Sequence, residues 1–263
     1  MESSNALATT TTTLTAGSLI GGQPVTFTAT VSSGGFRIVP TGQVVFAMNG
    51  SPVATVDLND AGVATYTASN LAVGAYSVIA SYSGDTQCAA SSTRISVTII
   101  PAQPTFSLPS GKYIGSATVQ ILESVPGAVI HYTIDGTEAT YESPVYNGAP
   151  FTFTAGYRVL RAVATASGIS SPEVYASYSV VEQTPTPTIN PAPGTYAAGQ
   201  LITITDSLPT ASFRYTTDGT TPTVTSPVYP GPFPVTGSGY VRAIAISTGD
   251  EPSNVASSYF SVP

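Results

Sequence analysis

The stretches "IHYTIDGTEATYESPVY" (residues 130–146) and "FRYTTDGTTPTVTSPVY" (residues 213–229) are two versions of one pattern, 83 positions apart. Each opens with a short aromatic and β-branched run, which favours an extended strand, and the run ends in Asp-Gly. An Asp-Gly pair favours a tight turn, because Asp accepts hydrogen bonds from its own backbone and Gly adopts positive φ. Asp135, Gly136, Asp218 and Gly219 are therefore predicted to be structural turn residues.

The duplication extends well beyond these two stretches. Five tyrosine positions recur, together with one arginine pair, Arg161 and Arg242. The recurring tyrosines are Tyr113 with Tyr196, Tyr132 with Tyr215, Tyr146 with Tyr229, Tyr157 with Tyr240, and Tyr178 with Tyr259. The spacing falls from 83 to 81 after Tyr157, which predicts a loss of two residues there in the second copy. One domain type is thus used twice, with the shared tyrosines expected in its core.

Residues 1–100 follow a different pattern. "PVTFTATV" at 24–31 alternates apolar and polar residues with period two, as half-buried strands do. Asn49-Gly50 separates two further runs of this kind and predicts a two-residue hairpin turn. About seven strands in about 95 residues, with no helical periodicity, predict an Ig-like sandwich.

Short proline-bearing joints separate the parts: "PAQP" at 101–104 and "EQTPTP" at 182–187. We therefore predict an all-β chain of three tandem Ig-like or fibronectin-III-like β-sandwiches, at 1–100, 101–182 and 183–263. Proline fixes φ, so such joints are stiff and predict a rod.

Two families resemble these parts. Residues 9–99 resemble group 3 bacterial Ig-like domains, through "GGQPVTFTATV", "NDAGVATY" and "LAVGAYSVIASYSGD". Residues 104–180 and 187–262 resemble the chitobiase/β-hexosaminidase C-terminal module, which is fibronectin-III-like, through the two opening stretches, "GKYIGSATVQI" and "GTYAAGQLITI". The resemblance implies accessory modules of secreted hydrolases, adhesins and surface proteins, with no catalytic residues of their own.

Charge excludes several partner classes. The net charge is −7, with 7 basic residues in 263 and no basic stripe, which argues against nucleic acid and against an anionic membrane surface. No apolar run reaches the roughly 18–20 residues of a membrane-spanning helix. The first residues have neither the basic nor the apolar region of a secretion signal, so a signal, if one exists, is expected outside this chain.

Catalytic, metal and cofactor sites are not expected. The single histidine, His131, is replaced by Arg214 in the second copy, so no imidazole is shared and no Ser-His-Asp triad can recur. Asp135, Glu138 and Glu142 could gather around calcium, but the second copy retains only the aspartate. We expect no enzyme activity and no cofactor.

A sugar site is the main alternative, because sugars stack on exposed aromatic rings. Five of the fifteen tyrosines lie outside the shared positions: Tyr66, Tyr76, Tyr82, Tyr141 and Tyr175. The first three fall on predicted strands, and the chain has no tryptophan. Cys88 is the only cysteine, and it is interpreted as a small apolar residue at a strand edge or as one half of an intermolecular bridge.

The leading functional hypothesis is a non-enzymatic extracellular structural protein, the repeating subunit of a bacterial surface filament. Copies would associate through sandwich contacts, or by adding residues Asn5, Ala6, Leu7 and Ala8 as a strand to a neighbouring subunit. The alternative is a carbohydrate-binding or adhesive accessory region, or a stalk, of a larger secreted glycoside hydrolase or adhesin.

Overall fold

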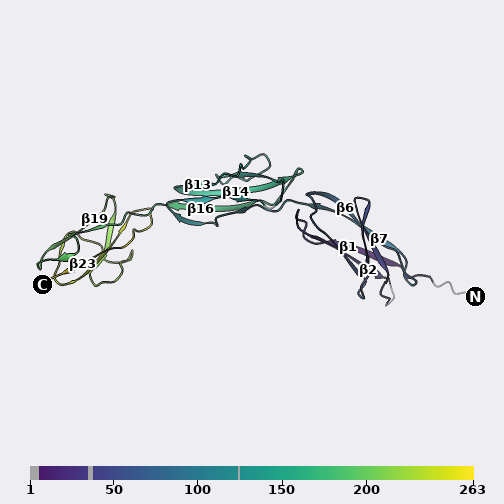
Figure 1. The fold of residues 1–263 in the computed structure, drawn as a ribbon, viewed down its shortest axis with the longest axis horizontal. Coiled ribbons are helices and arrows are strands. Elements are labelled where there is room, and N and C mark those ends of the chain that lie inside the picture. The colour runs from purple at the N-terminus through teal and green to yellow at the C-terminus, as the bar shows by residue number, and fades with distance from the viewer. Residues whose placement is uncertain (1–5, 35–37, 124) are drawn as a thin grey trace, which may run out of the picture. The chain divides into compact units, whose positions relative to one another are not determined.

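The computed structural model describes residues 6–34, 38–123 and 125–263. Strands are the only regular elements in these ranges, so no described helix could cross a membrane. Strand pairing separates into three groups along the chain, and the labelled strands of each group lie together in Figure 1. The prediction of three tandem β-sandwiches of the Ig-like and fibronectin-III-like kind is confirmed, while the domain boundaries stay a prediction.

Within the described residues, the first group contains seven strands in two sheets, ordered β1-β2-β5 and β4-β3-β6-β7. The strands are β1 (Thr10–Ala16), β2 (Val25–Ser33), β3 (Gln43–Met48), β4 (Ser51–Asp57), β5 (Val63–Ala68), β6 (Gly74–Tyr82) and β7 (Ser91–Ile99). Asn49 and Gly50 join β3 to β4 with φ values of 49° and 87°. Positive φ at both positions matches the right-handed strand twist, so the hairpin closes in two residues.

The core of the first group follows from the period-two pattern. Val25, Phe27, Ala29 and Val31 of β2 all point inward and are buried, while the threonines between them face outward. Phe27 stacks on Tyr66, which belongs to the partner strand β5. Alternation along one strand therefore builds one wall of the sandwich.

A buried tyrosine anchors the turn that follows β6. The Tyr82 hydroxyl donates to Asp85 Oδ2 (3.0 Å), and the Thr41 amide and hydroxyl donate to the same oxygen (2.8 and 2.9 Å). Asp85 Oδ1 accepts from the amides of Gln87 and Cys88, each at 2.7 Å. These hydrogen bonds, the one from the Thr41 amide most of all, hold the pKa of Asp85 far below its usual value. Burial raises the pKa of Tyr82 well above its usual value.

The second group is built on the sheet β12-β14-β16-β9, with β15 paired to β14 and the pairs β10-β13 and β8-β11 beside it. The strands are β8 (Thr105–Phe106), β9 (Gly111–Ile114), β10 (Ala117–Val119), β11 (Ile121–Leu122), β12 (Val129–Thr133), β13 (Phe151–Phe153), β14 (Gly156–Ala166), β15 (Ile169–Ser170) and β16 (Val174–Val181). Leu160, Ala162 and Ala164 of β14 are completely buried. The alternate residues of β14 form the outer face, where the candidate site lies.

The third group repeats this plan with sheets β17-β19-β21 and β18-β23-β22-β20. The strands are β17 (Thr188–Asn190), β18 (Gly194–Thr195), β19 (Leu201–Thr205), β20 (Ser212–Thr216), β21 (Phe233–Pro234), β22 (Gly239–Ile246) and β23 (Ala256–Ser261). β20 pairs with β22 in the register that β12 has with β14. The two copies therefore share strand pairing as well as sequence.

Register corrects one of the predicted tyrosine pairs. Tyr178 lies opposite Gly111 in one copy, whereas Phe260, not Tyr259, lies opposite Gly194 in the other. Tyr178 and Phe260 are both fully buried, but Tyr259 points outward. Tyr157 and Tyr240, which were also expected in the core, are exposed as well. The second copy has one extra residue in the turn before its last strand, and an alignment that matched Tyr to Tyr concealed it.

Candidate functional site

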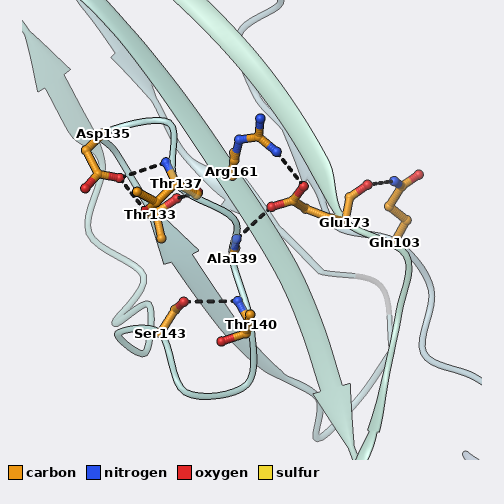
Figure 2. Close-up of polar contacts among 9 residues, drawn as sticks. All are labelled: Gln103, Thr133, Asp135, Thr137, Ala139, Thr140, Ser143, Arg161 and Glu173. Carbon is orange, nitrogen blue, oxygen red and sulfur yellow. Dashed lines mark hydrogen bonds and ion pairs between the residues drawn. The ribbon is translucent and has the colours of Figure 1, made fainter.

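The two Asp-Gly turns have the same internal bonding. Asp135 Oδ1 accepts from the Thr137 amide (3.0 Å) and hydroxyl (2.6 Å), and Thr133 Oγ1 donates to the Thr137 carbonyl (2.5 Å), as Figure 2 shows. Gly136 follows with φ of 87°. The Thr137 hydroxyl is the largest cause of a lowered pKa at Asp135. This carboxylate oxygen is already used within its own turn.

The second copy reproduces this turn atom for atom. Asp218 Oδ1 accepts from the Thr220 amide (2.9 Å) and hydroxyl (2.6 Å), and Thr216 Oγ1 donates to the Thr220 carbonyl (2.6 Å). Gly219 has φ of 80°, and the pKa of Asp218 is lowered for the same reason as that of Asp135. The two repeated sequence stretches, 130–146 and 213–229, therefore share a turn whose polar side chains hydrogen-bond within the turn itself.

After each turn the chain returns along the sheet edge. The Tyr132 amide donates to Pro144 (3.0 Å) and the Tyr146 amide donates to Ile130 (2.8 Å), so "SPVY" at 143–146 pairs with the edge of β12. The same pairing joins "SPVY" at 226–229 to β20. The sequence repeat revealed these segments but gave no signal for their pairing partner.

In the first copy an ion pair ties this returning loop to the outer sheet face. Glu173 Oε2 accepts from Arg161 Nη1 (2.7 Å), and Oε1 accepts from the Ala139 amide (2.7 Å). Gln103 Nε2 donates to the Glu173 carbonyl (2.5 Å), so one residue joins three segments in Figure 2. The Arg161 guanidinium also lies 5.3 Å from the centre of the Tyr175 ring. Nothing in the sequence repeat indicated this cluster, because its members come from two strands and from loops that are far apart in the sequence.

The second copy lacks this cluster. Counting back from the Tyr178–Phe260 equivalence, Glu173 becomes Val255 and Tyr175 becomes Ser257. Arg242 instead lies over Tyr240, 5.3 Å from the ring centre, on its own strand. The arginine that the two copies share therefore has a different partner in each copy.

Beside the loop, the outer face of the first copy carries a hollow of about 470 Å³. It is lined by Gly127, Val129, His131, Tyr141, Thr165, Ala166, Ser167, Gly168 and Ser170. Tyr141 is 67% exposed, whereas His131 is covered by the returning segment. Ser167 has φ of 50°, a left-handed conformation, in the turn between β14 and β15.

The remaining predicted contact residues lie at the start of the chain. Ala8 is already paired inside the first group, because its amide donates to Gln87 (2.8 Å) and its carbonyl accepts from Ala89 (2.8 Å). Ala6 and Leu7 are exposed and belong to no strand, and Asn5 lies outside the described residues. A strand contributed to a neighbour would therefore use residues before Ala8.

Metal ligands do not gather within the described ranges, where no three His, Cys, Asp or Glu side chains lie close enough to hold an ion. Glu138 and Glu142, which the calcium alternative requires, are both exposed. Cys88 is fully buried, not at an exposed strand edge, and burial raises the pKa of its thiol.

The geometry agrees with what comparison with protein families finds. Residues 108–176 and 191–257, more than half of the chain, match the chitobiase/beta-hexosaminidase C-terminal domain. The chain belongs to this family. Residues 7–100 match the bacterial Ig-like domain (group 3), so an Ig-like domain precedes two chitobiase/beta-hexosaminidase C-terminal domains. No curated protein sequence matches the chain.

Solved structures of tandem domains are similar in outline only. Extracellular domains 3–5 of Drosophila OTK match 92% of this chain with 93% of theirs, at 13% identity and a TM-score of 0.38. The fibronectin(III)-like modules of Clostridium thermocellum CbhA match 65% of this chain with 95% of theirs, at 17% identity and a TM-score of 0.28. The match to three N-terminal domains of the bacteriophage RB49 outer capsid protein Hoc covers 97% of this chain and 99% of that chain, at 14% identity and a TM-score of 0.28. Scores this low carry no functional argument.

Proposed function

We propose that the chain is a non-enzymatic structural protein of the cell exterior, and that copies of it associate as the repeating subunit of a bacterial surface filament. Ig-like and fibronectin-III-like domains are non-catalytic modules, and the matched bacterial families are typically extracellular. The structural or accessory role follows from the family, and the filament is the further step.

The observation that supports a structural role is that the recurring polar groups are used inside their own domain. The Asp135 and Asp218 carboxylates bond their own turns. The Tyr113 and Tyr196 hydroxyls donate to backbone carbonyls four residues earlier, at 2.7 and 2.8 Å. A duplicated active site would keep reactive groups free in both copies, whereas a duplicated framework uses them for its own stability.

Self-association has two candidate routes. Ala6 and Leu7 precede the paired Ala8 and are exposed, so they could extend as a strand onto a neighbour. Alternatively, the exposed sandwich faces could meet directly. Head-to-tail contacts of either kind propagate as a filament when the rotation between successive copies does not close a ring.

The test is sedimentation velocity with negative-stain electron microscopy on the full chain and on a variant lacking residues 1–7. This deletion stops before Ala8 and leaves β1 intact, and Ala6 and Leu7, the described residues that it removes, belong to no strand. Filaments that disappear on deletion support strand addition, and filaments in both samples support sandwich contacts. Monomers in both samples at high concentration would refute self-association and leave a spacer or accessory role.

A further inference from the structure

The two chitobiase/beta-hexosaminidase C-terminal domains differ in the residues that line the hollow beside Tyr141. Both contain the Asp-Gly turn and the returning "SPVY" segment, yet most of the residues lining the hollow in the first copy are replaced in the second. Tyr141 becomes Val224, and His131 becomes Arg214. The turn containing Ser167 also becomes one residue longer and loses its strand β15. The hollow is therefore a feature of one copy, not a consequence of the fold.

Tyr141 presents its ring to solvent. Its side chain is 67% exposed, and within the described residues it makes no side-chain hydrogen bond or ring contact. Tyr175, by contrast, has the Arg161 guanidinium over its ring. An open aromatic face carries partial negative charge and attracts the slightly positive C–H groups of a flat ligand.

Polar groups surround this ring, and no Asp, Glu, Lys or Arg is among the lining residues. His131 Nδ1 lies 2.8 Å from the Ser143 carbonyl, which can only accept, so Nδ1 carries the proton. In the neutral ring, Nε2 is then the acceptor, and His131 lines the hollow. Thr165, Ser167 and Ser170 add hydroxyls, and Gly127 and Gly168 leave backbone accessible.

This combination selects a ligand class. An aromatic face with several hydroxyls and one imidazole acceptor matches a molecule that has C–H faces and many hydroxyls. The absence of Asp, Glu, Lys and Arg among the lining residues disfavours an ionic ligand, because no permanently charged group there could offset its desolvation. A volume of about 470 Å³ lies in the range of ligand sites, roughly 300–1,000 Å³. We propose that the hollow beside Tyr141 binds a neutral carbohydrate, one or two sugar rings at a time, with one ring stacked on Tyr141.

The proposal does not depend on self-association, since all lining residues lie within the first copy. A single platform with a few hydroxyl contacts predicts weak binding, with a Kd on the order of 1 mM. Saturation-transfer NMR on the full chain suits this range. The probes are cellohexaose and maltohexaose, which are neutral, and hexagalacturonate, which is anionic.

Three variants localise the binding. Tyr141→Val reproduces the second copy and should weaken binding about tenfold, because the platform is lost. Tyr157→Val is the matched control: Tyr157 is 64% exposed but does not line the hollow, and binding should be unchanged. His131→Asn keeps a donor toward the Ser143 carbonyl and removes the Nε2 acceptor, so binding should weaken several-fold. Unfolding midpoints equal to that of the parent chain would show that the variants are folded.

The expected result is saturable binding of at least one neutral hexasaccharide, weakened by Tyr141→Val and unaffected by Tyr157→Val. Three outcomes would overturn the proposal: no binding of either neutral probe up to about 10 mM, preference for the anionic probe, or equal binding by Tyr141→Val and the parent chain. These outcomes are independent of the sedimentation result, because a chain that does not polymerise can still bind a sugar, and a chain that polymerises can fail to bind one.

Discussion

Replacing Asp85 with alanine is predicted to destabilise the Ig-like domain more than any other single carboxylate change in the chain. Five donors converge on this side chain: two from Thr41, one from Tyr82, and the amides of Gln87 and Cys88. Asp85 therefore fixes the turn after β6 to the loop before β3.

The magnitude depends on which donors water can reach after the change. Thr41 and Gln87 are exposed and can rehydrate, but Tyr82 and Cys88 are almost fully buried. A buried donor left unpaired costs about 1–3 kcal/mol, so two such donors predict a loss of about 3–4 kcal/mol in the free energy of unfolding. Tyr82→Phe removes a single hydroxyl and should cost about 1 kcal/mol.

Hydrogen exchange measured by mass spectrometry in moderate denaturant reads each domain separately. Peptides covering β2 should exchange about 100–1,000-fold faster in Asp85→Ala, whereas peptides covering β22 and β23 provide an internal reference. A loss below about 1 kcal/mol, or equal acceleration in all three domains, would show that Asp85 does not anchor the turn as argued.

Further predictions follow from other contacts. The lowered pKa of Asp85 means that its stabilisation is present above its usual pKa and lost as pH falls, so acid titration should destabilise the Ig-like domain below pH about 4, and less so in Asp85→Asn. Burial raises the pKa of Tyr178 to about 12, so the first chitobiase/beta-hexosaminidase C-terminal domain should lose stability as pH rises above about 10. The second copy has Phe260 in that place and lacks this contribution, so hydrogen-exchange rates of the two domains at pH 9 and 11 test the prediction. Gly62→Ala should destabilise the Ig-like domain by about 3 kcal/mol or more, because the new Cβ would lie 2.6 Å from the Val31 carbonyl oxygen at a φ of 72°. Gly50→Ala, at a φ of 87° with open space around it, should cost only about 1–2 kcal/mol, and chemical denaturation of the two variants measures the difference. Glu173→Gln keeps an acceptor for the Ala139 amide but removes the ion pair with Arg161, and faster exchange at residues 137–146 without a change in the β14 core would confirm that this pair holds the loop.

The sequence was sufficient for the fold because the signals it carries are local. Alternation along "PVTFTATV" set the inward face of β2, and Asn49-Gly50 set a hairpin whose two residues have positive φ. The internal repeat then predicted two domains of the same type, because a pattern that occurs twice can be compared position by position between its copies. The exception was Tyr259, where matching residue types concealed a one-residue insertion that only strand register could reveal.

The site was less predictable because its parts are far apart in sequence. His131, Tyr141 and Ser167 line one hollow but come from a strand, a loop and a turn. Tyr141 was identified as an unshared tyrosine, yet nothing in its surroundings indicated which residues it would meet. The Arg161–Glu173 pair was missed for a similar reason, since the sequence does not show which outer-face positions become neighbours.

The burial of Cys88 has a practical consequence for the experiments above. Its side chain is 0% exposed and its thiol resists ionisation, so maleimide reagents and oxidants should leave it untouched in the folded chain. A cysteine introduced at any exposed position would then be the only reactive thiol in the folded protein. Fluorophores or spin labels could be attached singly to each domain, without first removing a native residue, and distances between domains could be measured in solution.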